Sequence, residues 1–78
     1  MRVISTLTDG ELAKWRMVAA AKDLVDTPYP GYSIQEAKNA LIDYYKTLGD
    51  LLHAHEVPQN AEGIIVSHIT GCILQIDE

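Results

Sequence analysis

Apolar residues recur at helical spacing through residues 33–56. At about 100° per residue, one arc of this segment is apolar and the opposite arc is polar, with only Ile42 and Ala54 out of place. The pattern predicts one long amphipathic helix that covers an apolar surface formed by the rest of the chain. Its apolar arc contains Ile34, Ala37, Ala40, Leu41, Tyr44, Tyr45, Leu48, Leu51, Leu52 and His55.

Two capping motifs mark the starts of helices. Thr8 stands three residues before Glu11, and Ser33 stands three residues before Glu36. In such a capping box the hydroxyl accepts a backbone N–H of the first turn, and the Glu carboxylate accepts the N–H of the cap residue. The sequence therefore predicts helix starts directly after Thr8 and Ser33.

The first helix is predicted over residues 9–25. Residues 26–32 contain two prolines and a Pro-Gly pair, which end a helix and form a turn. Because this connection is short, the two helices are expected to be antiparallel neighbours. Pro58 is expected to end the second helix.

Residues 63–76 allow two interpretations. Their β-branched residues favour a strand, but no alternation of apolar and polar residues runs through the segment, and a hairpin turn at Thr70-Gly71 places Thr where φ is often positive. A helix gathers one apolar face, made of Ile65, Val66, Ile69, Cys72, Ile73 and Ile76. We therefore predict a third helix.

The predicted fold is all-α: an antiparallel helical hairpin closed by a third, C-terminal helix, in a single domain over residues 1–78. The alternative is an α+β fold, in which Val3-Ile4 and the C-terminal segment pair as strands. A chain of 78 residues buries only about 60% of its unfolded surface. Because 47% of the residues are hydrophobic, we expect burial to be completed by self-association into a homo-oligomer.

The charge balance argues against a nucleic-acid partner. The chain carries 11 acidic and 6 basic residues, for a net charge of −5, whereas phosphate binding depends on clustered Lys and Arg. Mimicry of nucleic acid by ranked carboxylates is also disfavoured, because the acidic residues of both helices alternate with lysines.

The sequence predicts a cytoplasmic protein. Its single cysteine excludes an internal disulfide and suits a reducing compartment. The first residues are too polar for a signal peptide, and no apolar run reaches the ~18 residues of a membrane span. We therefore expect no membrane partner.

The first helix has two apolar stripes, and the second is our candidate contact surface. The broader arc is expected to face the core; it comprises Ala13, Met17, Ala20, Ala21, Leu24 and Val25. The candidate surface consists of Leu12, Trp15, Arg16 and Ala19, since Trp and Arg dominate the energetics of protein interfaces. The alternative is that another helix simply covers this stripe.

A second candidate site lies at the loop between the helices. Tyr29 and Tyr32 precede the start of the second helix, and Lys38 follows about one turn inside it. Aromatic rings beside helix N–H groups can hold a nucleotide or another planar anion. Two tyrosines that pack a tight turn are the competing interpretation, and Glu36 disfavours an anion.

The residues that could ligate a metal do not converge in sequence. His53 and His55 point in nearly opposite directions on a helix, and His68 with Cys72 supplies only two of the four ligands of a closed zinc site. The same pair lacks an orienting acid nearby, which disfavours a nucleophile and its base. The sequence therefore predicts no metal, no cofactor and no enzymatic activity.

These observations together predict a small non-enzymatic interaction module. We expect an oligomeric regulator or inhibitor that binds another protein. The alternative is a small oligomer that binds a nucleotide-like ligand at a subunit boundary.

Overall fold

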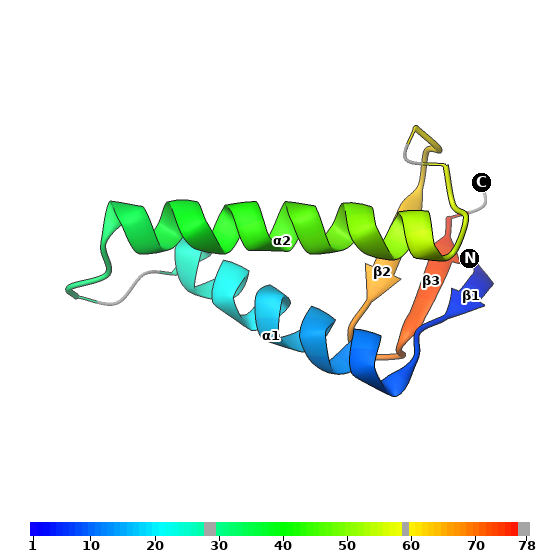
Figure 1. Cartoon of the computed structure of the whole chain (residues 1–78), viewed down its shortest axis with the longest axis horizontal. Coiled ribbons are helices and arrows are strands. Elements are labelled where there is room, and N and C mark those ends of the chain that lie inside the picture. The colour runs from blue at the N-terminus through cyan, green and yellow to red at the C-terminus, as the bar shows by residue number, and fades with distance from the viewer. Residues whose placement is uncertain (28–29, 59, 77–78) are drawn as a thin grey trace.

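The computed structural model describes residues 1–27, 30–58 and 60–76. Three strands and two helices follow one another in the order β1 (Arg2–Thr6), α1 (Asp9–Asp26), α2 (Ile34–Ala54), β2 (Ile64–Ser67) and β3 (Cys72–Gln75). The two helices form a splayed antiparallel pair, and the sheet lies near the N-terminus of α1 and the C-terminus of α2 (Figure 1). The fold is thus α+β.

The prediction of an all-α fold with a third helix over residues 63–76 is wrong. This segment forms a β-hairpin, in which β2 and β3 are antiparallel and joined by residues 68–71. Gly71 has φ +72° and donates its N–H to the Ser67 carbonyl at 3.0 Å, which closes the turn. Glycine, not Thr70, takes the left-handed position, so the turn places no strained conformation on a β-branched residue.

The three-stranded sheet has the order β1-β3-β2, with both neighbouring pairs antiparallel. The pairing of the N-terminal strand with the C-terminal segment is the alternative that the sequence left open. A bulge at Ile4 shifts the register of β1 against β3. Four cross-strand rows result: Arg2–Gln75–Ile64, Val3–Leu74–Ile65, Ser5–Ile73–Val66 and Thr6–Cys72–Ser67.

Successive rows of the sheet face opposite sides, as the pleat requires. Ile73 is fully buried and Val66 is buried beside it, both packed against the helices. The row of Ser5, Ile73 and Val66 therefore belongs to the inner face. The rows that contain Leu74 and Cys72 form the outer face, opposite the helices.

Both helices begin where the caps predict. The Thr8 hydroxyl accepts the Glu11 N–H and the Glu11 carboxylate accepts the Thr8 N–H, which completes the capping box. The Ser33 hydroxyl accepts the Glu36 N–H. Because each cap satisfies donors that the first helical turn leaves unpaired, these two boundaries are set locally.

Helix α2 ends before Pro58. His55 is its C-cap, and Glu56 adopts a left-handed conformation with φ 57°. The Val57 N–H then donates to the Leu52 carbonyl at 2.8 Å, which is the bond of a Schellman motif. This reversal turns the chain back over the core, so that Val57 is buried.

The hydrophobic core lies between the two helices and the inner face of the sheet. Trp15 and Val18 of α1 meet Leu51 and Leu52 of α2 over Ile73 of β3. The prediction that the arc with Met17 and Leu24 faces this core is wrong. The residues of that arc are exposed or only half-buried, namely Ala13, Met17, Ala20, Ala21, Leu24 and Val25.

Candidate functional site

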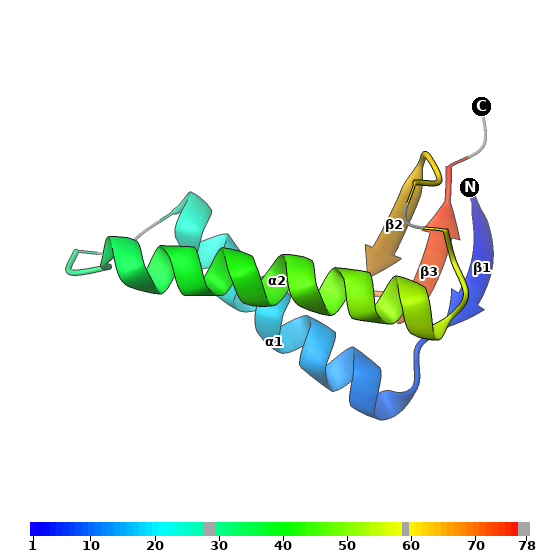
Figure 2. The same ribbon diagram turned by 45° about the horizontal axis from the view of Figure 1, so that its top comes forward.

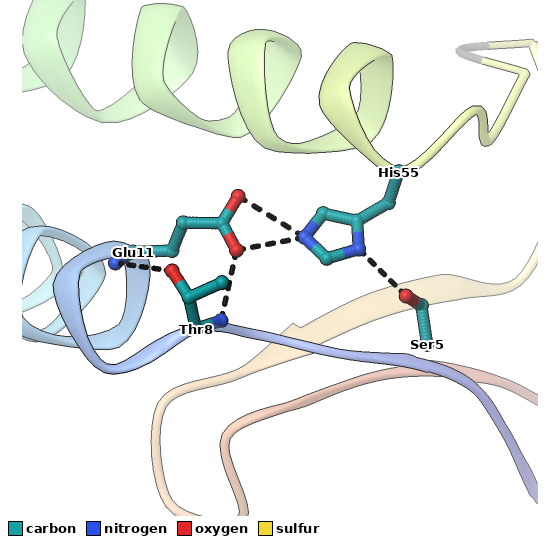
Figure 3. Close-up of polar contacts among 4 residues, drawn as sticks. All are labelled: Ser5, Thr8, Glu11 and His55. Carbon is teal, nitrogen blue, oxygen red and sulfur yellow. Dashed lines mark hydrogen bonds and ion pairs between the residues drawn. The ribbon is translucent and has the colours of Figure 1, made fainter.

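Three polar side chains from three elements meet where α1 begins and α2 ends, at the end of the helix pair beside the sheet (Figure 3). The His55 ring lies between Ser5 of β1 and Glu11 of α1. Its Nδ1 is 2.6 Å from the Ser5 Oγ, and its Nε2 is 2.9 and 3.0 Å from the two carboxylate oxygens of Glu11. We call Ser5, Glu11 and His55 the polar cluster.

The Glu11 carboxylate determines which ring nitrogen of His55 carries a proton. The hydrogen bond from the Thr8 backbone N–H lowers the pKa of Glu11; burial opposes this shift, and His55 adds to it. The carboxylate is therefore ionised near neutral pH and can only accept hydrogen bonds, so the His55 Nε2 carries the proton. In the neutral ring Nδ1 is then an acceptor, and the Ser5 hydroxyl donates to it.

The order serine–histidine–carboxylate resembles the relay of acyl-transfer enzymes, but its surroundings differ. Ser5 lies in the inner row of the sheet, next to Ile73. An open hollow of about 370 Å³ adjoins Glu11, at the other end of the relay, and the Ser5 hydroxyl is not part of its lining. This hollow is lined by Gly10, Glu11, Lys14, Thr47, Asp50, Leu51 and Ala54.

The polar cluster therefore acts as a clamp. His55, at the end of α2, binds the capping box of α1 and the inner side of β1 at once. The His55 and Glu11 side chains retain only 14% and 23% of their exposure, so water weakens this contact less than it weakens a surface ion pair. The clamp holds the start of α1 and the end of α2 against the sheet.

We expect Glu11→Gln to reduce the loss of stability in acid. Because folding lowers the pKa of Glu11, the ionised carboxylate favours the folded state above the ordinary carboxyl pKa. That contribution is lost as pH falls through the lower, folded-state pKa. The free energy of unfolding, measured by urea titration from about pH 7 to pH 3, should fall less steeply in Glu11→Gln than in the wild type.

Asp43→Asn is the matched control, since it neutralises an exposed acid of α2. Its acid profile should follow that of the wild type. Equal acid slopes for Glu11→Gln and the wild type would contradict the lowered pKa of Glu11 in the folded state.

The predicted contact residues of α1 divide between the core and the surface. Trp15 is 2% exposed and Ala19 is buried, whereas Leu12 is half-buried and Arg16 is exposed. The Trp15 Nε1 donates to the Val66 carbonyl at 2.8 Å. Its ring stacks on Tyr44 at 4.8 Å between centroids. Trp15 thus anchors α1 to α2 and to β2, and it is not accessible to another protein.

Two of the predicted ligand residues, Tyr32 and Lys38, lie toward the other end of α2 from the hollow. Tyr32 is half-buried in the loop, Lys38 is exposed on α2, and Tyr29 lies outside the described residues. The hollow instead adjoins Ala54, in the last turn of α2. Its lining does not include Tyr32 or Lys38, so the described geometry does not connect this loop with a pocket.

The residues with metal-ligand chemistry are scattered. His53 and His68 are exposed, and Cys72 is half-buried on the outer face of the sheet. Among residues 1–27, 30–58 and 60–76, no group of three or more His, Cys, Asp or Glu side chains is placed to hold a metal ion.

Exposed apolar side chains occur on several parts of the described chain, and we name two groups of them. The sheet patch is the outer row formed by Val3, Leu74 and Ile65, in which Val3 is 60% exposed and Ile65 is 39% exposed. The α1 stripe lies on the side of α1 turned away from Trp15. It consists of Ala13, Met17, Ala20 and Leu24, all exposed.

Comparisons with known protein families, with curated proteins and with solved structures found no match. Among the described residues, no helix is both long enough and apolar enough to cross a membrane.

Sequence reasoning missed the polar cluster because its members come from three distant segments. The sequence identifies Glu11 only as part of a local capping box. The available signal was His55, a polar residue on the otherwise apolar arc of α2. A half-buried imidazole needs partners for both ring nitrogens, but the sequence did not show which residues supply them.

Proposed function

We propose that this protein is a non-enzymatic interaction module that regulates or inhibits another protein by occupying part of its surface. The observation that carries this proposal is the sheet patch. Val3, Leu74 and Ile65 form one apolar row across all three strands, on the face that neither helix covers. Uncovered apolar side chains gathered in this way are typical of protein-binding surfaces.

The sheet offers a rigid platform for such contacts. Leu74 is in the central strand, hydrogen-bonded on both sides, and it is backed by the fully buried Ile73. A docking surface that needs no reorganisation loses little conformational entropy on binding. The next outer row adds Cys72, whose half-buried thiol lies on the same face.

The charge of the chain indicates the kind of partner. A net charge of −5 favours a protein with a basic rim around an apolar patch, and it disfavours anionic partners. We place this interaction in the cytoplasm, because a lone half-exposed thiol suits a reducing compartment. The complex should weaken as salt concentration rises.

The test compares Ile65→Glu with Ile42→Glu. Both replace an exposed isoleucine, on the sheet patch and on α2 respectively. A partner recovered from cells of the source organism should crosslink to a photoreactive residue at position 65. Ile65→Glu should weaken its binding by roughly tenfold or more, because the substitution places an unpaired charge in an apolar contact.

Ile42→Glu should bind the same partner as the wild type does, with the same helical circular dichroism in all three proteins. Equal binding by the two variants, or equal crosslinking from positions 65 and 42, would rule out the sheet patch as the contact surface.

A further inference from the structure

We propose that two copies of this chain pair through their α1 stripes as an antiparallel helical dimer. The hydrophobic composition of the chain led us to expect a homo-oligomer, and this inference assigns self-association to a surface separate from the sheet patch. No other element covers the side of α1 that is turned away from α2 and the sheet (Figures 1 and 2).

The spacing of the α1 stripe is that of a helix-pairing seam. Ala13, Met17, Ala20 and Leu24 follow one another at intervals of four, three and four residues, the a/d spacing of a coiled coil. Met17 is 64% exposed and Leu24 is 44% exposed. Exposed side chains of this size at seam spacing leave one apolar strip along about three turns of α1.

The seam is complementary to itself only in the antiparallel arrangement. A two-fold axis between positions 18 and 19 places Met17 opposite Ala20 of the second copy, and Ala13 opposite Leu24. Each layer then pairs a large side chain with a small one, which keeps the helix separation even and fills space. A parallel pair instead places Met17 against Met17 and Ala20 against Ala20, so that crowded and empty layers alternate.

Charges along one flank favour the same arrangement. Arg16 and Asp23 lie seven residues apart on one side of the stripe, and both are exposed. The two-fold axis brings Arg16 of one copy near Asp23 of the second copy, and the reverse pair forms at the other end. The Arg16 Nε donates to the His68 carbonyl at 3.1 Å, which leaves the other guanidinium N–H groups for a carboxylate.

An isologous contact of this kind is the form that most homodimers take. Four side chains from each copy make a small interface, so we expect a dissociation constant on the order of micromolar. Self-association of this strength depends on protein concentration in the range that sedimentation measures directly.

The first test is the solution mass of Met17→Glu, with Ile42→Glu as the matched control. Sedimentation up to ~300 µM, well above the expected dissociation constant, should give a dimer for the wild type and for Ile42→Glu. Met17→Glu should sediment as a monomer with unchanged helical circular dichroism. A monomeric wild type, or a dimeric Met17→Glu, overturns the proposal.

Exchanging the charges of Arg16 and Asp23 tests their predicted pairing between the two copies. Asp23→Arg should weaken the dimer about five- to tenfold, because it faces Arg16 of the second copy with a like charge. The double variant Arg16→Asp/Asp23→Arg should regain most of the wild-type affinity. Failure of the double variant to regain affinity, with its circular dichroism intact, contradicts the predicted pairing.

Disulfide trapping tests the direction of pairing. In a Cys72→Ala background, Ala13→Cys and Leu24→Cys proteins are mixed and oxidised. Disulfides between the two different variants indicate antiparallel pairing, and disulfides within each variant indicate parallel pairing, which overturns the proposal. Two variants separate this proposal from the proposed function. Ile65→Glu should no longer bind the partner protein but should still form the dimer. Met17→Glu should no longer form the dimer but should still bind the partner protein.

Discussion

Trp15→Ala should unfold this protein or leave it only marginally stable. The indole is 2% exposed, stacks on Tyr44 and donates to the Val66 carbonyl. Truncating a buried Trp costs about 3–5 kcal/mol, whereas a domain of this size has a total stability of roughly 4–12 kcal/mol. Urea titration followed by circular dichroism should show most of the wild-type stability lost.

Trp15→Phe separates packing from hydrogen bonding. It retains an aromatic ring against Tyr44 but leaves the Val66 carbonyl without its donor, which costs about 1–3 kcal/mol. We expect its stability to lie between those of the wild type and Trp15→Ala. A Trp15→Ala protein that unfolds at the wild-type urea concentration would mean that Trp15 is a surface anchor.

Gly71→Val should destabilise the β2–β3 hairpin. Gly71 has φ +72°, and a Cβ at this position would lie 3.1 Å from the Cδ2 of Leu12. The left-handed conformation costs a residue with a Cβ about 1–2 kcal/mol, and crowding adds about 1–3 kcal/mol. A loss of about 2–5 kcal/mol in the free energy of unfolding should follow.

Gly10→Ala is the matched control for this substitution. Gly10 lies in the first turn of α1, and a Cβ added there meets no heavy atom of the described residues within 4 Å. Its stability should equal or slightly exceed that of the wild type, because Ala is favoured over Gly in a helix. If Gly71→Val were no less stable than Gly10→Ala, the turn would not depend on glycine.

The helices could be predicted from sequence because their signals are local. The Thr8–Glu11 capping box and the Ser33 cap lie within one turn of the helix starts that they set. The amphipathic arc of α2 is confirmed for most of its residues, but Ile34 and Tyr45 of the predicted apolar arc are 89% and 60% exposed. Thr47, a polar residue outside the predicted apolar arc, is buried, because the surrounding packing decides how far the buried face extends.

The hairpin was missed because its alternation reverses phase at the turn. In β2 the even positions face the core, as Val66 does, whereas in β3 the odd positions face it, as Ile73 does. A single period of two therefore fails when it is applied to residues 64–76 as one segment. Because outward-facing Ile65 and Cys72 are next in sequence to inward-facing Val66 and Ile73, these residues also fit the apolar face of a helix.

The two faces of α1 could not be ranked by sequence alone. Both stripes are apolar, and the sequence pattern predicts that the broader one, with Met17 and Leu24, faces the core. The structure buries the stripe of Trp15 instead, because the indole N–H reaches the Val66 carbonyl across the fold. That bond joins residues 51 positions apart, a distance over which the sequence pattern carries no information.

The strand order has a consequence for synthesis. β3 is the middle strand and the last of the five elements, so β1 and β2 lack their common neighbour until residues 72–75 leave the ribosome. The helical hairpin can form earlier from contacts near in sequence, whereas the sheet joins distant segments and closes late. Until then the inner faces of β1 and β2 are open to water. A nascent chain stalled before Cys72 would therefore expose apolar strand surface to which chaperones can bind.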